Sequence, residues 1–127
     1  MNGVTIEKLM SVHSDERGTI TDLLNKEIGH VGMITTTKGT VRGNHYHMRS
    51  TQYSYILSGK FQVVIAELHD LIKTETVVLE AGDLITIQPY VVHSFKALED
   101  AVMIDMISES REGKNYENDV IKGLKLQ

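Results

Sequence analysis

A chain of 127 residues can bury the core of one domain and is too short for two. Its 13 basic and 17 acidic residues are interspersed and give a net charge of −4, which argues against nucleic-acid binding. The absence of cysteine excludes disulfides and thiolate metal sites. No apolar run could span a bilayer, and residues 1–18 are too charged for a signal peptide. We therefore expect a cytoplasmic protein without nucleic-acid or membrane partners.

β patterning runs through almost the whole chain. Short β-branched and aromatic runs alternate with turn-forming residues, which is typical of an all-β sandwich or barrel. Residues 5–11 fit either a strand or a short helix, and residues 116–123 are predicted to form a short helical tail. Ser58-Gly59-Lys60 predicts a hairpin between its flanking strands. Besides the strand that carries His45 and His47, the predicted strands, in chain order, are residues 19–24, 30–37, 52–57, 61–68, 75–79, 84–87, 92–98 and 101–107.

Two histidines separated by one residue give the strongest chemical signal in the chain. Between Gly39 and Gly59, His45 and His47 occupy alternate positions of a predicted strand. Side chains alternate across a strand, so both imidazoles project from one face, close enough to share an ion or a proton. The simpler interpretation of this pair taken alone is two exposed strand histidines.

Two further side chains complete a candidate metal site. Gln52 begins the next predicted strand, and His93 comes from a distant one. Neutral imidazole is a common metal ligand, whereas an amide oxygen binds a metal only weakly. We expect these four side chains to converge on a divalent metal, such as Zn, Ni, Mn or Fe, with water completing the coordination. The predicted metal ligands are His45, His47, Gln52 and His93.

The spacing of glycines and histidines in this segment resembles the cupin superfamily. The first cupin motif, G-x5-H-x-H-x4-E-x6-G, is matched with glutamine in place of the family's glutamate. The matching residues are Gly39, His45, His47, Gln52 and Gly59.

The second cupin motif, G-x5-P-x-G-x2-H-x3-N, is matched only in part. Gly82 and His93 fall on their places, whereas the proline, second glycine and asparagine positions hold Gln88, Tyr90 and Ala97. The resemblance covers residues 19–107. It implies that residues 1–127 form a single-domain cupin jelly-roll barrel, all-β apart from its short C-terminal helical tail.

Finer resemblances concern two groups of cupins that act on nucleotide-linked sugars. The R-G-N-H-Y-H segment at residues 42–47 is similar to the cupin domain of capsular-polysaccharide biosynthesis proteins, which epimerise a UDP-linked ketosugar and carry zinc. The D-x-R-G segment at residues 15–18, Gln52 and the Y-E-N-D-x-I segment at residues 116–121 resemble the dTDP-sugar 3,4-ketoisomerases. Those enzymes work without metal and use a histidine pair. Their tyrosines in the preceding strand are replaced here by Gly32 and Met33, so no catalytic tyrosine is carried over.

These resemblances imply an isomerase or epimerase acting on a nucleotide-linked 4-keto-deoxysugar in surface polysaccharide biosynthesis. Moving a carbonyl, or inverting the centre beside it, needs a base and an acid, and histidine serves as either near neutral pH. We assign catalysis to His45 and His47, one removing the proton and the other polarising or protonating the sugar oxygen. Arg42 is assigned to the enolate or diphosphate charge.

Further substrate contacts are predicted, each with a simpler alternative. Beside Arg42, we assign Tyr55, Tyr90 and Asp105 to the substrate. The alternatives are a surface ion pair for Arg42, cross-strand packing for Tyr55, an exposed loop position for Tyr90 and the outer sheet face for Asp105. An inward-facing Asp105 could also orient a histidine.

Two other functions are also compatible with the sequence. The chain could be a metal-dependent cupin of other small-molecule chemistry, for example dioxygenase-like, or a non-catalytic cupin that binds a small ligand. We also expect a homodimer, because an exposed sheet edge in so small a barrel favours pairing or exchange of an N-terminal strand.

Overall fold

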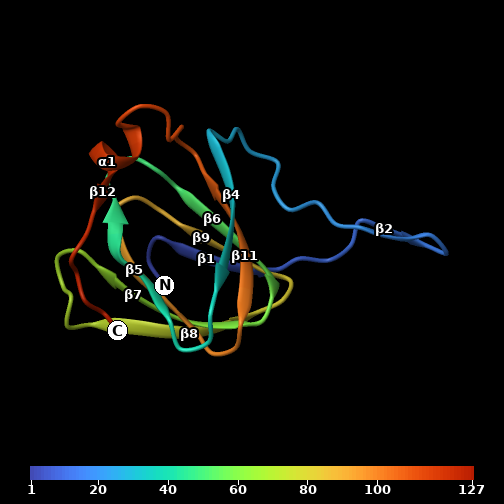
Figure 1. The fold of residues 1–127 in the computed structure, drawn as a ribbon, viewed down its shortest axis with the longest axis horizontal. Helices are drawn as coiled ribbons and strands as arrows, with labels where there is room; N and C mark the ends of the chain where they lie inside the picture. The colour runs from blue at the N-terminus through green and yellow to red at the C-terminus, as the bar shows by residue number, and fades with distance from the viewer.

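The computed structural model describes residues 1–127 as two antiparallel five-stranded sheets packed face to face (Figure 1). The strands are β1 (Val4–Lys8), β2 (His13–Asp15), β3 (Gly18–Ile20), β4 (His30–Thr36), β5 (Val41–His47), β6 (Gln52–Ser58), β7 (Lys60–Glu67), β8 (Thr74–Glu80), β9 (Asp83–Ile87), β10 (Val91–Ala97), β11 (Ala101–Ile107) and β12 (Val120–Ile121), and the helix is α1 (Asn115–Asp119). The first sheet has the order β1-β9-β6-β11-β4, and the second has the order β12-β5-β10-β7-β8. The expected all-β barrel with a short C-terminal helix is confirmed.

An apolar core fills part of the space between the two sheets. Phe61, Ile56 and Leu79 are fully buried and belong to a cluster of 12 buried apolar residues. Burying each such side chain contributes about 1.5–3 kcal/mol. Beside this cluster the inner faces turn polar: Gln52, Ser54 and Asp105 lie on the first sheet, and His47 and His93 lie on the second. The polar part of the interior is where a functional site can form.

The predicted hairpin around Gly59 is wrong. β6 pairs with β9 and β11 in the first sheet, whereas β7 pairs with β8 and β10 in the second. The turn at Gly59 therefore carries the chain from one sheet to the other. Gly59 has a φ of +80°, and a Cβ there would lie 2.4 Å from the carbonyl oxygen of Asp100. Glycine is needed because the chain crosses against the β10–β11 connection.

The ends of the chain differ in detail from the sequence-based expectation. The predicted strand at residues 19–24 is reduced to β3, which pairs with β2 in a two-stranded arm projecting from the barrel (Figure 1). Residues 5–11 form a strand, β1, over Val4–Lys8. The predicted helical tail is a five-residue helix followed by β12, which pairs with the edge of β5. The protein has no helix that is long and apolar enough to cross a membrane.

Candidate active site

Pairing between β5 and β10 brings the histidines together. His45 lies opposite His93, and a β-bulge follows, so that Gly43 lies opposite Ser94 and Asn44 is the extra residue. Gly43 and Asn44 have φ values of +93° and +58°. A Cβ on Gly43 would lie 2.8 Å from the carbonyl oxygen of His93, so only glycine fits there. The R-G-N sequence before His45 thus builds the bulge that sets the position of the histidines.

Three imidazoles converge in the interior. One ring nitrogen each from His45, His47 and His93 lies within 4.8 Å of the others. The ring centroids are 4.7 Å apart for His45 and His93, 5.2 Å for His45 and His47, and 5.7 Å for the stacked rings of His47 and His93. All three rings line a cavity of about 470 Å³. They are therefore inward-facing residues and not the exposed pair of the simpler interpretation.

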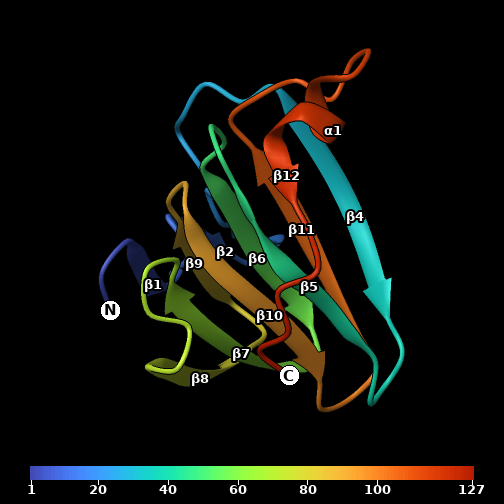
Figure 2. The same ribbon diagram turned by 90° about the vertical axis from the view of Figure 1, so that its left-hand side faces the viewer.

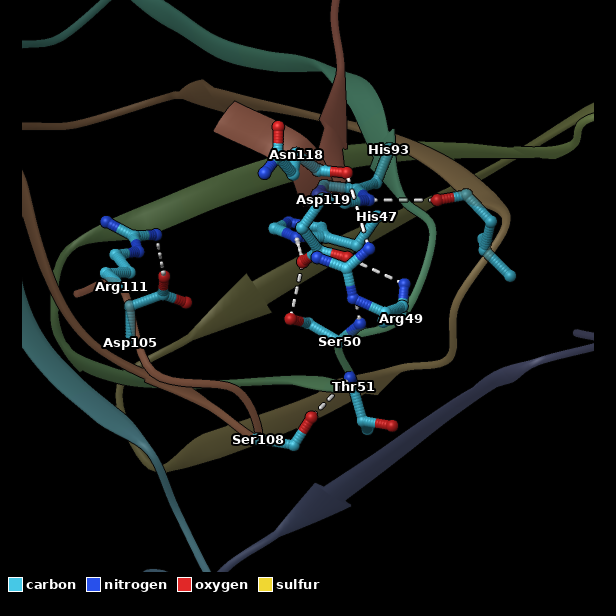
Figure 3. A network of polar contacts seen from close by, with 11 residues as sticks. His47, Arg49, Ser50, Thr51, His93, Asp105, Ser108, Arg111, Asn118 and Asp119 are labelled. Carbon is cyan, nitrogen blue, oxygen red and sulfur yellow. Dashed lines mark hydrogen bonds and ion pairs between the residues drawn. The ribbon is translucent and has the colours of Figure 1, made fainter. Parts of the chain in front are cut away.

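Hydrogen bonds define which nitrogen of two histidines faces the cavity. His93 Nδ1 lies 3.0 Å from the carbonyl oxygen of Val91, which can only accept, so this nitrogen carries the proton. His47 Nδ1 lies 3.1 Å from Asp119 Oδ2 (Figure 3). The Nε2 atoms of His47 and His93 are buried and have no hydrogen-bond partner. Each can offer a lone pair to a metal ion or a substrate proton.

Burial keeps His45 and His93 uncharged at neutral pH. Burial and then the neighbouring His45 lower the pKa of His93 to about 3. Burial also lowers the pKa of His45 to about 4, with further contributions from His47, Lys122 and Arg111. Neutral imidazoles are the form that binds metals and accepts protons.

Asp119 is the residue that orients His47, and sequence reasoning gave it no role. Besides His47, its carboxylate accepts hydrogen bonds from Ser50 Oγ at 2.5 Å and the Arg49 amide at 2.6 Å (Figure 3). Burial opposes ionisation, but the hydrogen bonds from Ser50, Arg49 and His47 prevail and lower the pKa of Asp119. The Y-E-N-D-x-I segment contained the only sequence signal, because 72 residues separate Asp119 from His47.

A polar chain on the first sheet forms the opposite wall. Gln52 Nε2 donates to Ser54 Oγ at 3.0 Å, and Ser54 Oγ donates to Asp105 Oδ1 at 2.7 Å. This chain fixes the Gln52 amide and leaves its oxygen as the remaining acceptor. Burial raises the pKa of Asp105. Asp105 faces inward, as expected, but its partners are Ser54 and Arg111, so orienting a histidine falls to Asp119 instead.

Arg42 lines the cavity, and hydrogen bonds hold its guanidinium in one position. Its Nε donates to Thr36 Oγ1 and its Nη2 donates to the Thr35 carbonyl oxygen, both at 2.9 Å. These contacts hold the guanidinium against β4. The alternative of a surface ion pair does not apply, because no carboxylate pairs with Arg42.

Two predicted substrate contacts lie outside the cavity, contrary to expectation. Tyr55 alternates with the inward-facing Ser54 and Ile56 along β6, so its ring is on the outer face of the first sheet. Tyr90 is 52% exposed, and its ring packs 5.9 Å from that of Tyr46. The cavity is lined instead by three residues to which the sequence had given no role, namely Arg111, Tyr116 and Lys122.

The sequence matches the polysaccharide biosynthesis C-terminal domain family over residues 13–120. The chain belongs to this family. A relative, the spore coat polysaccharide biosynthesis protein SpsL of Bacillus subtilis, is 31% identical over 110 residues, which cover 77% of this chain and 72% of SpsL.

Solved structures show that this family member has the expected cupin fold. The sugar 3,4-ketoisomerase QdtA of Thermoanaerobacterium thermosaccharolyticum, crystallised with TDP, superposes with a TM-score of 0.79 at 21% identity, over 97% of this chain and 90% of QdtA. The 3'-monoepimerase ChmJ of Streptomyces bikiniensis, in complex with dTDP-quinovose, gives a TM-score of 0.78 at 17% identity, over 94% of this chain and 69% of ChmJ. The resemblance to nucleotide-sugar cupins is thereby confirmed at the level of the fold.

The site of this family member can do two kinds of chemistry. A neutral imidazole whose far nitrogen contacts a carboxylate can remove a proton, because the carboxylate stabilises the imidazolium that forms. The same free nitrogens, grouped within 4.8 Å, suit a divalent first-row metal. Both uses draw on the Nε2 atom of His47.

Proposed function

We propose that this protein is an isomerase or epimerase that moves a proton next to the carbonyl of a nucleotide-linked 4-keto-deoxysugar, in surface polysaccharide biosynthesis. One observation carries the proposal: His47 is held by Asp119 through Nδ1 while its Nε2 is directed into a cavity without a partner. The support from relatives is consistent, since QdtA is a sugar 3,4-ketoisomerase, ChmJ is a 3'-monoepimerase and SpsL takes part in spore coat polysaccharide biosynthesis.

In the proposed reaction, His47 Nε2 removes the proton from the carbon beside the carbonyl. The ionised Asp119 stabilises the positive charge that His47 acquires, and its hydrogen bonds to Ser50 and Arg49 keep it in place. His45, neutral and beside His47, polarises the sugar oxygen on which negative charge develops. Arg42 adds a fixed positive charge to the cavity wall. Return of the proton to the same carbon from the opposite face gives the epimer. For the isomer, the hydroxyl proton passes to the former carbonyl oxygen, and the carbon-bound proton returns to the former carbonyl carbon.

A metal-dependent reaction is the second candidate, favoured by the grouping of three imidazole nitrogens. His45, His47 and His93 would hold the ion, and the oxygen of Gln52 would be a weak fourth ligand. A bound divalent ion would stabilise the enediolate as a Lewis acid. Elemental analysis of the purified protein decides between the two: close to one equivalent of metal supports the second candidate, and less than a tenth supports proton transfer by His47.

We also propose that the protein works as a homodimer. Val31, Met33 and Leu57 on the outer face of the first sheet are 61%, 68% and 52% exposed. The β2–β3 arm projects away from its own barrel (Figure 1). It carries Ile20, which is 58% exposed. A second copy of the chain offers the matching apolar surface for both.

Turnover of TDP-4-keto-6-deoxyglucose, followed by proton NMR of the sugar, tests the proposed function. The wild-type protein should convert this substrate or its UDP-linked counterpart. His47→Asn should lose activity about 100-fold to 10,000-fold, because the base is gone. Asp119→Asn should lose a comparable factor, since an amide at that position favours the wrong tautomer of His47. Circular dichroism checks that both variants are folded. Activity of His47→Asn near the wild-type rate would show that the base is elsewhere.

A further inference from the structure

At the mouth of the cavity, the charged side chains of Arg111 and Lys122 both lie against the ring of Tyr116. The Arg111 guanidinium carbon lies 4.4 Å from the centroid of the Tyr116 ring, and Lys122 Nζ lies 5.6 Å from the same centroid. All three residues line the cavity. They come from the segment that follows β11: Arg111 precedes α1, Tyr116 is in α1, and Lys122 follows β12. Figure 2 shows α1 and β12 at one end of the barrel.

Neither cation has a carboxylate in close contact. Lys122 has no carboxylate within 4.0 Å, although the chain as a whole is acidic. The single carboxyl group within 4.0 Å of Arg111 is Asp105, at 3.9 Å (Figure 3). Asp105 is buried, and its Oδ1 accepts a hydrogen bond from Ser54 Oγ. Arg111 Nε is buried and has no hydrogen-bond partner.

Arg111 and Lys122 carry like charges and contact the same ring, so they repel each other, and only the Asp105 carboxyl, 3.9 Å from Arg111, lies near either of them. An anion that contacts both would remove the repulsion and satisfy donors of the guanidinium. Arginine offers a planar pair of N–H groups to phosphate oxygens, and lysine adds a point charge beside it. The Tyr116 ring contacts both cations and so keeps the two side chains next to each other.

We infer that Arg111, Lys122 and Tyr116 form an anion subsite at the cavity mouth, which binds the diphosphate of the nucleotide-linked substrate. This assignment rests on the proposed function for the identity of the substrate, but not for the existence of the site. The sugar then extends inward to His47, and the nucleoside lies toward solvent. The Arg42 guanidinium, held against β4, is then not needed for the diphosphate and can interact with the sugar oxygen.

Isothermal titration calorimetry with inorganic pyrophosphate, dTDP and thymidine tests the subsite. Wild-type protein should bind pyrophosphate and dTDP, and thymidine should bind at least tenfold more weakly than dTDP. Arg111→Gln/Lys122→Gln should weaken pyrophosphate and dTDP at least tenfold. The matched control Lys60→Gln/Lys96→Gln removes the same charge from exposed positions outside the cavity and should stay within twofold of wild type.

Two substitutions of Tyr116 test whether its aromatic ring contributes to anion binding. Tyr116→Phe keeps the ring and should bind pyrophosphate as wild type does, whereas Tyr116→Ala should weaken binding several-fold. Equal loss in Phe and Ala would assign the effect to the hydroxyl group and contradict the inferred role of the ring.

Failure of the subsite and failure of the proposed function give different results. Wild-type protein that binds no pyrophosphate, or a double variant that binds as tightly as wild type, overturns the subsite whatever the activity. Binding that depends on Arg111 and Lys122, in a protein without isomerase or epimerase activity, would retain the subsite and overturn the function.

Discussion

At the scale of single residues, hydrogen bonds and burial decide which imidazole can act as a base. Asp119 and the Val91 carbonyl oxygen occupy the Nδ1 atoms of His47 and His93 and leave both Nε2 atoms toward the cavity. The lowered pKa values of His45 and His93 keep these two imidazoles uncharged near neutral pH. The sequence pattern predicted that His45 and His47 share one face, because alternation along a strand is local, whereas the expected meeting with His93 depended on the pairing of two distant strands. It could not predict Asp119, whose contact depends on the path of the whole chain.

The lowered histidine pKa values predict how stability depends on pH. In the folded protein the pKa of His45 is about 4 and that of His93 about 3, against about 6.5 for an unperturbed histidine. Between pH 6.5 and 4 the unfolded chain therefore binds more protons at these positions than the folded chain. The free energy of unfolding should fall as the pH falls through this window, as measured by urea denaturation of metal-free protein. His45→Asn should show a shallower decline, and an equal decline would contradict the assigned pKa of His45.

At the scale of elements, the β5 bulge is the feature on which the site depends. Gly43→Ala places a Cβ 2.8 Å from the His93 carbonyl oxygen at a φ of +93°, so we expect a loss of about 2–3 kcal/mol in stability. Gly39→Ala is the matched control, because Gly39 has a φ of +88° but no atom within 4 Å of its Cβ position. It should cost about 1 kcal/mol. Chemical denaturation measures both, and equal losses would show that the close approach at Gly43 is unimportant.

Local patterns predicted most strand positions, but not which strands pair. The ranges 30–37, 75–79 and 101–107 lie within a residue or so of β4, β8 and β11, since alternation and turn residues are local signals. The hairpin at Gly59 was predicted wrongly, because a tight turn does not reveal that the second strand joins the opposite sheet. For the same reason Arg111, Tyr116 and Lys122 were missed. They reach the cavity mouth only when β12 pairs with β5.

At the scale of the whole molecule, two sheets with a half-polar interior make one cavity with chemically distinct walls. Histidines from the second sheet face the chain of Gln52, Ser54 and Asp105 on the first. The segment after β11 adds positive charge at the opening. The proposed substrate would place its anionic part at the opening and its carbonyl-bearing sugar inside.

The exposed apolar face of the first sheet predicts the assembly. Val31→Asp/Met33→Asp introduces two charges into the proposed dimer interface and should convert the protein to a monomer. Val78→Asp is the control, because Val78 is 53% exposed on β8 of the other sheet. Size-exclusion chromatography with light scattering gives the mass of each. A wild-type mass of one chain, or a dimer that survives both charges, would rule out this interface.

Solvent deuterium exchange tests the central claim most directly. Wild-type protein and TDP-4-keto-6-deoxyglucose are incubated in D₂O, and proton NMR follows the signal of the carbon-bound hydrogen beside the carbonyl. The proton that His47 removes exchanges with solvent before it returns, so we expect this signal to disappear with wild type and to persist with His47→Asn. Loss of the signal at equal rates in both proteins, or no loss beyond the enzyme-free rate in wild type, would contradict proton transfer by His47.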